Sequence, residues 1–170
     1  KYAERGLKFS GPGRQAYPDK AAYHYFHAAL LGLRVDAYRA AAMNVVPKLR
    51  AAAERALKLD KGYDHAGPLR IYGSLLATVP ETSPFNGDIE KGTALLKQAV
   101  TLAPDFPLNH FFLAEAYARD EEEDDAVKHF HRVVCAKVGP HWDRFMAQRY
   151  VTKAREALRK LKKPDQPTCP

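Results

Sequence analysis

The sequence predicts an all-α fold, a solenoid of antiparallel helical hairpins that ends in a capping helix. Alanine is abundant while threonine, valine and isoleucine are sparse, which favours helices over strands. Similar helix endings recur at residues 56–60, 99–104 and 133–134, and 34 residues separate Ala99 from Val133. A fixed period of this kind is typical of stacked helical repeats.

The composition favours one globular domain and argues against a transmembrane segment and a nucleic-acid partner. The chain has 170 residues, of which 46% are hydrophobic and 28% charged. No run of about 20 apolar residues occurs, so no transmembrane segment is predicted. The net charge is +7, but the densest basic run, residues 159–163, ends the last predicted helix, where cations stabilise the helix dipole without a partner. We therefore expect no nucleic-acid partner.

The periodicity divides the chain into three repeat units, a capping helix and a tail. The units cover residues 21–61, 63–104 and 107–136, and together with the cap they form one helical-repeat domain over 1–163. The predicted helices span residues 21–36, 43–59, 65–78, 88–102, 107–118, 122–136 and the cap 141–162. Residues 164–170 form a Pro-rich tail.

The third unit carries the clearest core pattern. Leu113 and Ala114 are followed at helical spacing by Tyr117, and Ala126, Phe130 and Val133 form one stripe of the next helix. Small residues allow the two helices to cross closely while larger ones fill the space beside them. We therefore predict that the first helix of this unit packs on Phe130.

The N-terminal segment and one long loop depart from the regular pattern. Residues 2–9 resemble the second helix of a further hairpin, which predicts additional sequence upstream of Lys1. The motif Gly11-Pro12-Gly13 predicts a linker turn, and no Lys-Ser/Thr pair follows it as in a phosphate-binding loop. Residues 79–88 lengthen the second unit by nine residues, and we expect the Phe85 ring in this loop to be shielded by the neighbouring hairpin or by a partner.

The two cysteines, Cys135 and Cys169, form no C-x-x-C motif, which excludes zinc-ribbon and c-type haem sites. Cys135 occupies an apolar helix position and Cys169 lies in the Pro-rich tail. This placement favours two free thiols, and pairing in an oxidising compartment is the alternative.

No residue pattern predicts catalysis, a cofactor or a metal site. His24 and His27 share a helix face but lack a third ligand, and His129 and His131 diverge on a helix. The acidic run 120–125 predicts a solvated turn that stabilises the following helix. No serine lies in a nucleophile-elbow motif. We therefore expect a protein that binds rather than an enzyme.

The remaining candidate site is the groove that the first helices of the repeats line. Counting from the core positions places a mixture of aromatic, cationic and anionic side chains there, which suits a peptide, a partner helix or an acid ligand. The alternative is that Phe111 belongs to the core and that the charges are ordinary surface. The candidate binding residues of the groove and the long loop are Arg70, Ser74, Phe85, Phe111, Glu115 and Arg119.

These segments resemble known families at two levels. The 34-residue period and the Leu-Ala…Tyr core resemble tetratricopeptide (TPR) repeats. More narrowly, residues 56–73, the loop that closes on Gly87-Asp88, and residues 102–109 leading into 113–117 resemble the T-component proteins of bacterial TRAP transporters. That resemblance implies TPR-like hairpins and an accessory role in the uptake of organic acids or hydrophobic ligands.

The resemblance also implies a location and partners. The location would be the periplasm or cell envelope, with lipid anchoring through a segment upstream of Lys1, although no lipid-attachment cysteine lies near Lys1. The partners would be a periplasmic substrate-binding protein or subunits of an envelope complex, and a homo-oligomer is a further expectation. The alternative function is a generic TPR adaptor that holds another assembly together, which leaves a cytoplasmic location open.

Overall fold

The computed structural model describes residues 2–37 and 42–169, and 74% of these residues are helical. Apart from an isolated bridge between Gly139 and Trp142, no strand pairing occurs among them, which confirms the predicted all-α class. The helices are α1 (Tyr2–Ala16), α2 (Ala21–Ala37), α3 (Ala42–Leu59), α4 (Tyr63–Thr78), α5 (Ile89–Leu102), α6 (Pro107–Arg119), α7 (Glu123–Val134) and α8 (Arg144–Lys160).

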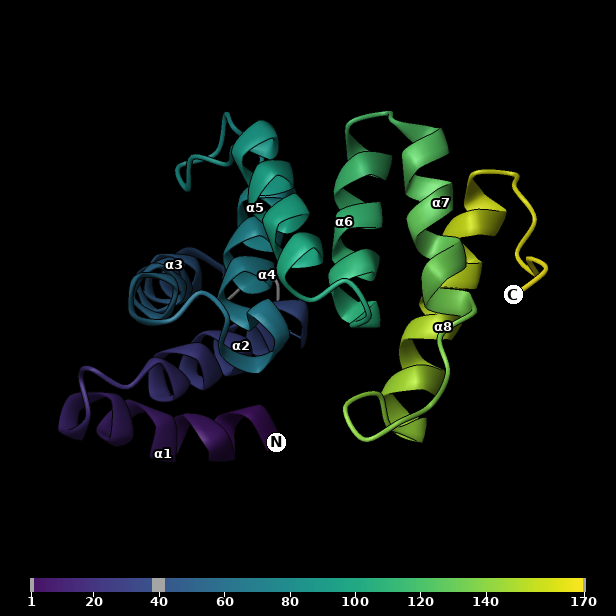
Figure 1. Cartoon of the computed structure of the whole chain (residues 1–170). Coiled ribbons are helices and arrows are strands. Elements are labelled where there is room, and N and C mark those ends of the chain that lie inside the picture. Colours follow the sequence, from purple (N-terminus) through teal and green to yellow (C-terminus); the bar gives the residue numbers. More distant parts are fainter. Residues whose placement is uncertain (1, 38–41, 170) are drawn as a thin grey trace.

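Consecutive helices pack as antiparallel hairpins, and the hairpins stack into a curved array (Figure 1). The pairs are α2 with α3, α4 with α5, and α6 with α7, and the predicted helix ends are right to within three residues. Helix α4 contacts both α2 and α6, so the first helices of successive hairpins lie next to one another. Helix α8 packs on α7 and α6 at the end of the array.

Helix α1 corrects one expectation from the sequence. The predicted turn at residues 11–13 is wrong, because Pro12 lies inside α1. Helix α1 packs against α2, and a Cβ at Gly13 would lie only 2.6 Å from Cδ1 of Tyr23. Gly13 thus lets the two helices approach closely, and this packing outweighs the local turn signal.

The core of the C-terminal half lies between α6, α7 and α8. Phe130 and Leu113 are almost fully buried, and the ring centroids of Phe111 and Phe130 lie 6.0 Å apart. The predicted packing of α6 on Phe130 is therefore confirmed. Trp142 and Leu158 extend this cluster toward α8, which covers the last hairpin as a capping helix should.

The long loop between α4 and α5 is fastened to α3. Arg50 donates from Nη2 to the carbonyl oxygens of Phe85, at 2.6 Å, and Asn86, at 2.8 Å. The Phe85 side chain is half-buried. The loop therefore has a defined conformation held from the neighbouring hairpin.

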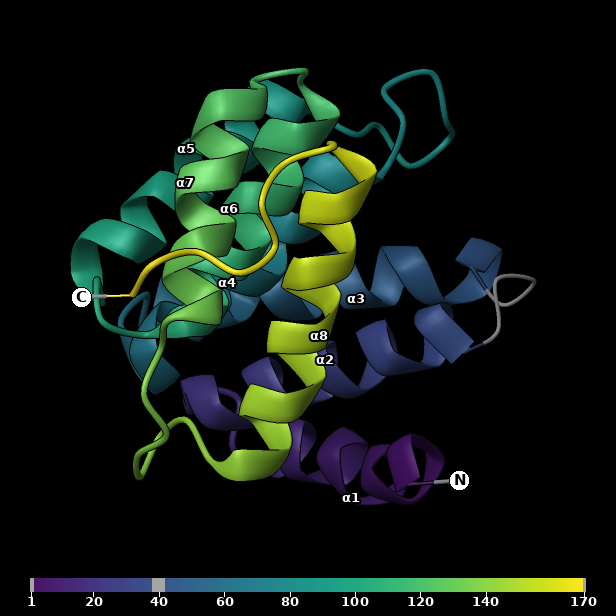
Figure 2. The same cartoon turned by 90° about the vertical axis from the view of Figure 1, so that its right-hand side faces the viewer.

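The tail corrects a second expectation. Cys135 and Cys169 form a disulfide with their Cα atoms 5.3 Å apart, so the favoured prediction of two free thiols is wrong. The tail folds back from the end of α8 across α7 (Figure 2). His131 donates from Nε2 to the Pro164 carbonyl at 3.0 Å, and Arg159 pairs with Asp165 at 2.7 Å. These contacts bring Cys169 to the end of α7.

Candidate ligand-binding site

A cavity of about 370 Å³ lies on the inner side of the array, where α2, α4 and α6 meet. Its volume falls in the range of small-molecule sites. Most of the lining side chains are aliphatic or aromatic, and they come from α2, α3, α4, α6 and α8. The lining residues are Tyr25, Ala28, Ala29, Gly32, Leu33, Val35, Val46, Leu49, Arg70, Ile71, Ser74, Leu75, Thr78, Val79, Leu108, Phe112 and Tyr150.

Helical spacing explains why these residues share one face. On α4 the lining positions recur every three or four residues, at Ile71, Ser74 and Thr78. On α2 the small residues Ala28 and Gly32 follow the same spacing and leave room between the helices. The cavity is therefore a product of small side chains at a helix crossing.

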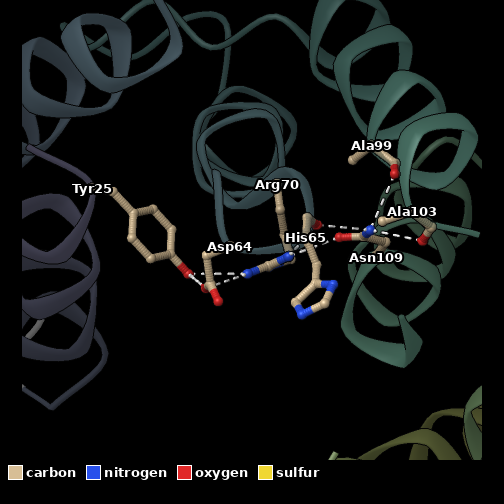
Figure 3. Close-up of polar contacts among 7 residues, drawn as sticks. All are labelled: Tyr25, Asp64, His65, Arg70, Ala99, Ala103 and Asn109. Carbon is tan, nitrogen blue, oxygen red and sulfur yellow. Dashed lines mark hydrogen bonds and ion pairs between the residues drawn. The ribbon is translucent and has the colours of Figure 1, made fainter. Parts of the chain in front are cut away.

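Arg70 lies at one end of this cavity and is only 4% exposed. Its Nη1 donates to Oδ1 of Asn109 at 2.8 Å and to the His65 carbonyl at 3.1 Å (Figure 3). Its Nη2 donates to the Tyr25 hydroxyl at 3.0 Å and lies 3.4 Å from Oδ2 of Asp64. Protein acceptors thus occupy both terminal nitrogens of the guanidinium.

Asn109 joins three helices through the same cluster. It is fully buried, and its Nδ2 lies 3.1 Å from the carbonyl oxygens of His65, Ala99 and Ala103 (Figure 3). The last two carbonyls lie at and just after the end of α5, and each also accepts a backbone N–H, from Ala103 at 3.0 Å and from Phe106 at 3.3 Å. Asn109 therefore fixes α6 to the beginning of α4 and the end of α5. We call Tyr25, Asp64, His65, Arg70 and Asn109 the polar clasp.

The clasp holds an unusual backbone at the beginning of α4. Asp64, His65 and Ala66 have φ values of 49°, 55° and 63°, in the left-handed region that costs about 1–2 kcal/mol per non-glycine residue. The Tyr25 hydroxyl donates to Oδ2 of Asp64, and burial raises the pKa of Tyr25 well above its usual value. Tyr25 thus remains a neutral donor, and the surrounding bonds maintain the strained segment.

The six residues predicted for binding lie in different places. Arg70 and Ser74 meet at the cavity. Phe111 is buried against Phe130 in the core, while Arg119 is exposed at the end of α6. Glu115 is half-buried on α6, and Phe85 lies in the loop next to Arg50, so neither lines the cavity.

Besides Tyr25 of the polar clasp, two further aromatic residues line the cavity without being singled out by the sequence. Phe112 stands one position after the predicted Phe111, and Tyr150 comes from α8. An error of one residue in the helix register explains the first omission. The second arises because a capping helix is expected to cover the core rather than to line a site.

The described parts of the chain hold no group of three metal-ligating side chains close enough to bind a metal ion. None of their helices is long and apolar enough to cross a membrane.

Comparison with models of known protein families identifies a family for this chain. The family model described as TRAP transporter T-component matches residues 19–165. No curated protein matches the sequence. The matched range contains α2 to α8, and with them the cavity and the polar clasp, while α1 and Cys169 lie outside it.

Proposed function

The chain belongs to the TRAP transporter T-component family, and from that premise we propose that it is a non-catalytic accessory that binds a small apolar molecule in the inner cavity. The accessory role in transport follows from the family. The proposal adds the class of ligand, the site that holds it and the location of the protein.

The observation that carries the proposal is the chemistry of the cavity wall. Aliphatic and aromatic side chains dominate the wall, and the nearby cation of Arg70 is already bonded to Asn109 and Tyr25. Recognition would therefore depend on apolar contact rather than on a charge. An alkyl chain of about eight carbons would contribute about 6 kcal/mol on burial, before the costs of association.

Filling the cavity tests this proposal. Ser74→Leu places a larger side chain on the cavity wall, and Thr101→Leu makes a matching change at an exposed position of α5. Binding of the neutral fluorescent probe N-phenyl-1-naphthylamine, and its displacement by decanol or decanoate, is measured for both variants. We expect about tenfold weaker binding in Ser74→Leu and no change in Thr101→Leu.

The pair of competitors tests the role assigned to Arg70. Because its terminal nitrogens are occupied, decanol and decanoate should bind with affinities within about threefold of each other. A strong preference for decanoate would show that Arg70 receives the ligand. Absence of probe binding in the unmodified protein would refute the cavity as a ligand site.

The disulfide supports a location in the cell envelope, since such bonds persist in oxidising compartments such as the periplasm. A substrate-binding protein is the partner that this location and the family favour. Crosslinking of the protein in intact envelopes, followed by mass spectrometry, tests both points. Crosslinks to cytoplasmic proteins alone would refute them.

A further inference from the structure

A second cavity, of about 700 Å³, shares no residue with the first. It lies between the beginning of α6, one face of α7 and the C-terminal tail. Its lining residues are Pro104, Asp105, Pro107, His110, Lys128, His131, Arg132, Cys135, Ala136, Pro167 and Thr168. We call it the tail pocket.

A basic stripe of α7 forms one wall of the tail pocket. Lys128, His131, Arg132 and Cys135 recur at helical spacing, so they share a face of the helix. Within residues 2–37 and 42–169 neither Lys128 nor Arg132 forms an ion pair. Asp105 is the single carboxylate among the lining residues. Two permanent cations and one carboxylate thus line the pocket.

Two histidines line the pocket, and one of them, His110, adds no charge to this wall. His110 donates from Nε2 to the Pro104 carbonyl at 2.6 Å, so its Nδ1 must accept the proton of His129 Nδ1, 2.7 Å away. Burial lowers the pKa of both rings; the positive charge of Arg132 adds to this effect at both, and that of Lys128 adds to it at His129. Lys128 and Arg132 supply the permanent positive charges of the wall.

The C-terminal tail contributes Pro167 and Thr168 to the lining of the pocket. The disulfide between Cys135 and Cys169 fixes the end of the tail against α7. Near the other end of the tail, Lys163 lies 3.6 Å from the fully exposed carboxylate of Asp124. An intact disulfide is therefore a condition for a complete pocket.

We propose that the tail pocket binds a small oxyanion with at least two negative charges, and that the disulfide is required for this binding. Lys128 and Arg132 stand one helical turn apart, so two anionic groups of one molecule can engage both. An arginine fork suits carboxylate and phosphate oxygens alike. This site is independent of the apolar cavity, and its ligand differs in chemical class.

Calorimetric titration of the full oxidised chain with inorganic pyrophosphate and with citrate tests the proposal. Lys128→Gln/Arg132→Gln should weaken binding at least about tenfold. The control Lys91→Gln/Arg144→Gln removes the same charge from exposed positions outside the pocket and should leave binding unchanged. Cys135→Ser/Cys169→Ser, verified as folded by circular dichroism, should weaken binding about fivefold or more, although both cations remain.

Four results would overturn the proposal. No binding in the unmodified protein would refute the site, and equal losses in the two charge variants would show unspecific attraction of anions. Unchanged affinity in the double serine variant would refute the requirement for the disulfide. Binding to phosphatidylglycerol vesicles, without binding to either free anion, would show that the basic stripe serves a lipid surface.

Discussion

Replacing Asn109 by alanine should lower the free energy of unfolding by about 3–5 kcal/mol. The side chain accepts one hydrogen bond from the charged Arg70 group, which is worth about 1.5–3 kcal/mol. Its two amide hydrogens serve the carbonyls of His65, Ala99 and Ala103, so at most two further full bonds exist, at about 1 kcal/mol each. Alanine also leaves a buried cation short of an acceptor, which adds to the loss.

Urea unfolding, monitored by far-ultraviolet circular dichroism, measures this loss, and the melting temperature should fall by roughly 10 °C. Thr101→Ala is the control, because its exposed hydroxyl bonds only to a carbonyl of its own helix, and its effect should stay within about 0.5 kcal/mol. Asn109→Asp keeps the acceptor for Arg70, but it replaces the amide nitrogen by an oxygen that points at the three carbonyl oxygens. Because these oxygens repel one another, this variant should also lower the free energy of unfolding. A loss below about 1 kcal/mol in Asn109→Ala would refute the role assigned to the clasp.

Acid should weaken the fold through His110 and His129. Burial lowers the pKa of His129 to about 4, below the value of about 6.5 expected for the unfolded chain, so unfolding takes up a proton and stability falls as the pH drops from about 6.5 to 4. Chemical denaturation should show that the free energy of unfolding falls by about 1–2 kcal/mol over this pH range, a modest value because the ring is partly exposed. His129→Gln should flatten this pH dependence. Cys169→Ser should cost about 3–4 kcal/mol, the closure entropy of a ring of this size, and equal melting temperatures with and without reductant in the unmodified protein would contradict this. Arg50→Ala should release the long loop and speed its cleavage by protease, and Phe85→Ala should lower either the melting temperature or self-association, whereas no change in either would make the loop a neutral insertion.

The order of the helices is predictable because apolar residues recur at helical spacing over long segments. The polar clasp is not, since Arg70 and Asn109 are 39 residues apart and each resembles a surface residue of an amphipathic helix. The sequence places Arg70 in the groove but gives no indication that protein acceptors surround it. Only the stacking of α6 on α4 and α5 brings Asn109 into contact with it.

Two local signals give wrong predictions for different physical reasons. The Gly-Pro-Gly motif favours a turn, yet Pro12 is accommodated in α1, which packs on α2 through Gly13. The disulfide escapes prediction because the tail before Cys169 has no periodicity from which its path could be inferred. Its return to Cys135 depends on contacts such as that of His131 with the Pro164 carbonyl.

The disulfide also changes how the molecule would respond to mechanical force. Residues 135 and 169 are joined, so the 34 peptide units between them lie in a covalent ring that includes α8. A pull on the two ends of the chain bypasses this ring and loads α1 to α7 alone. About 120 Å of contour length could be extended only after the disulfide is reduced. Tension on the two ends of the chain thus cannot extend the capping helix while the disulfide is intact.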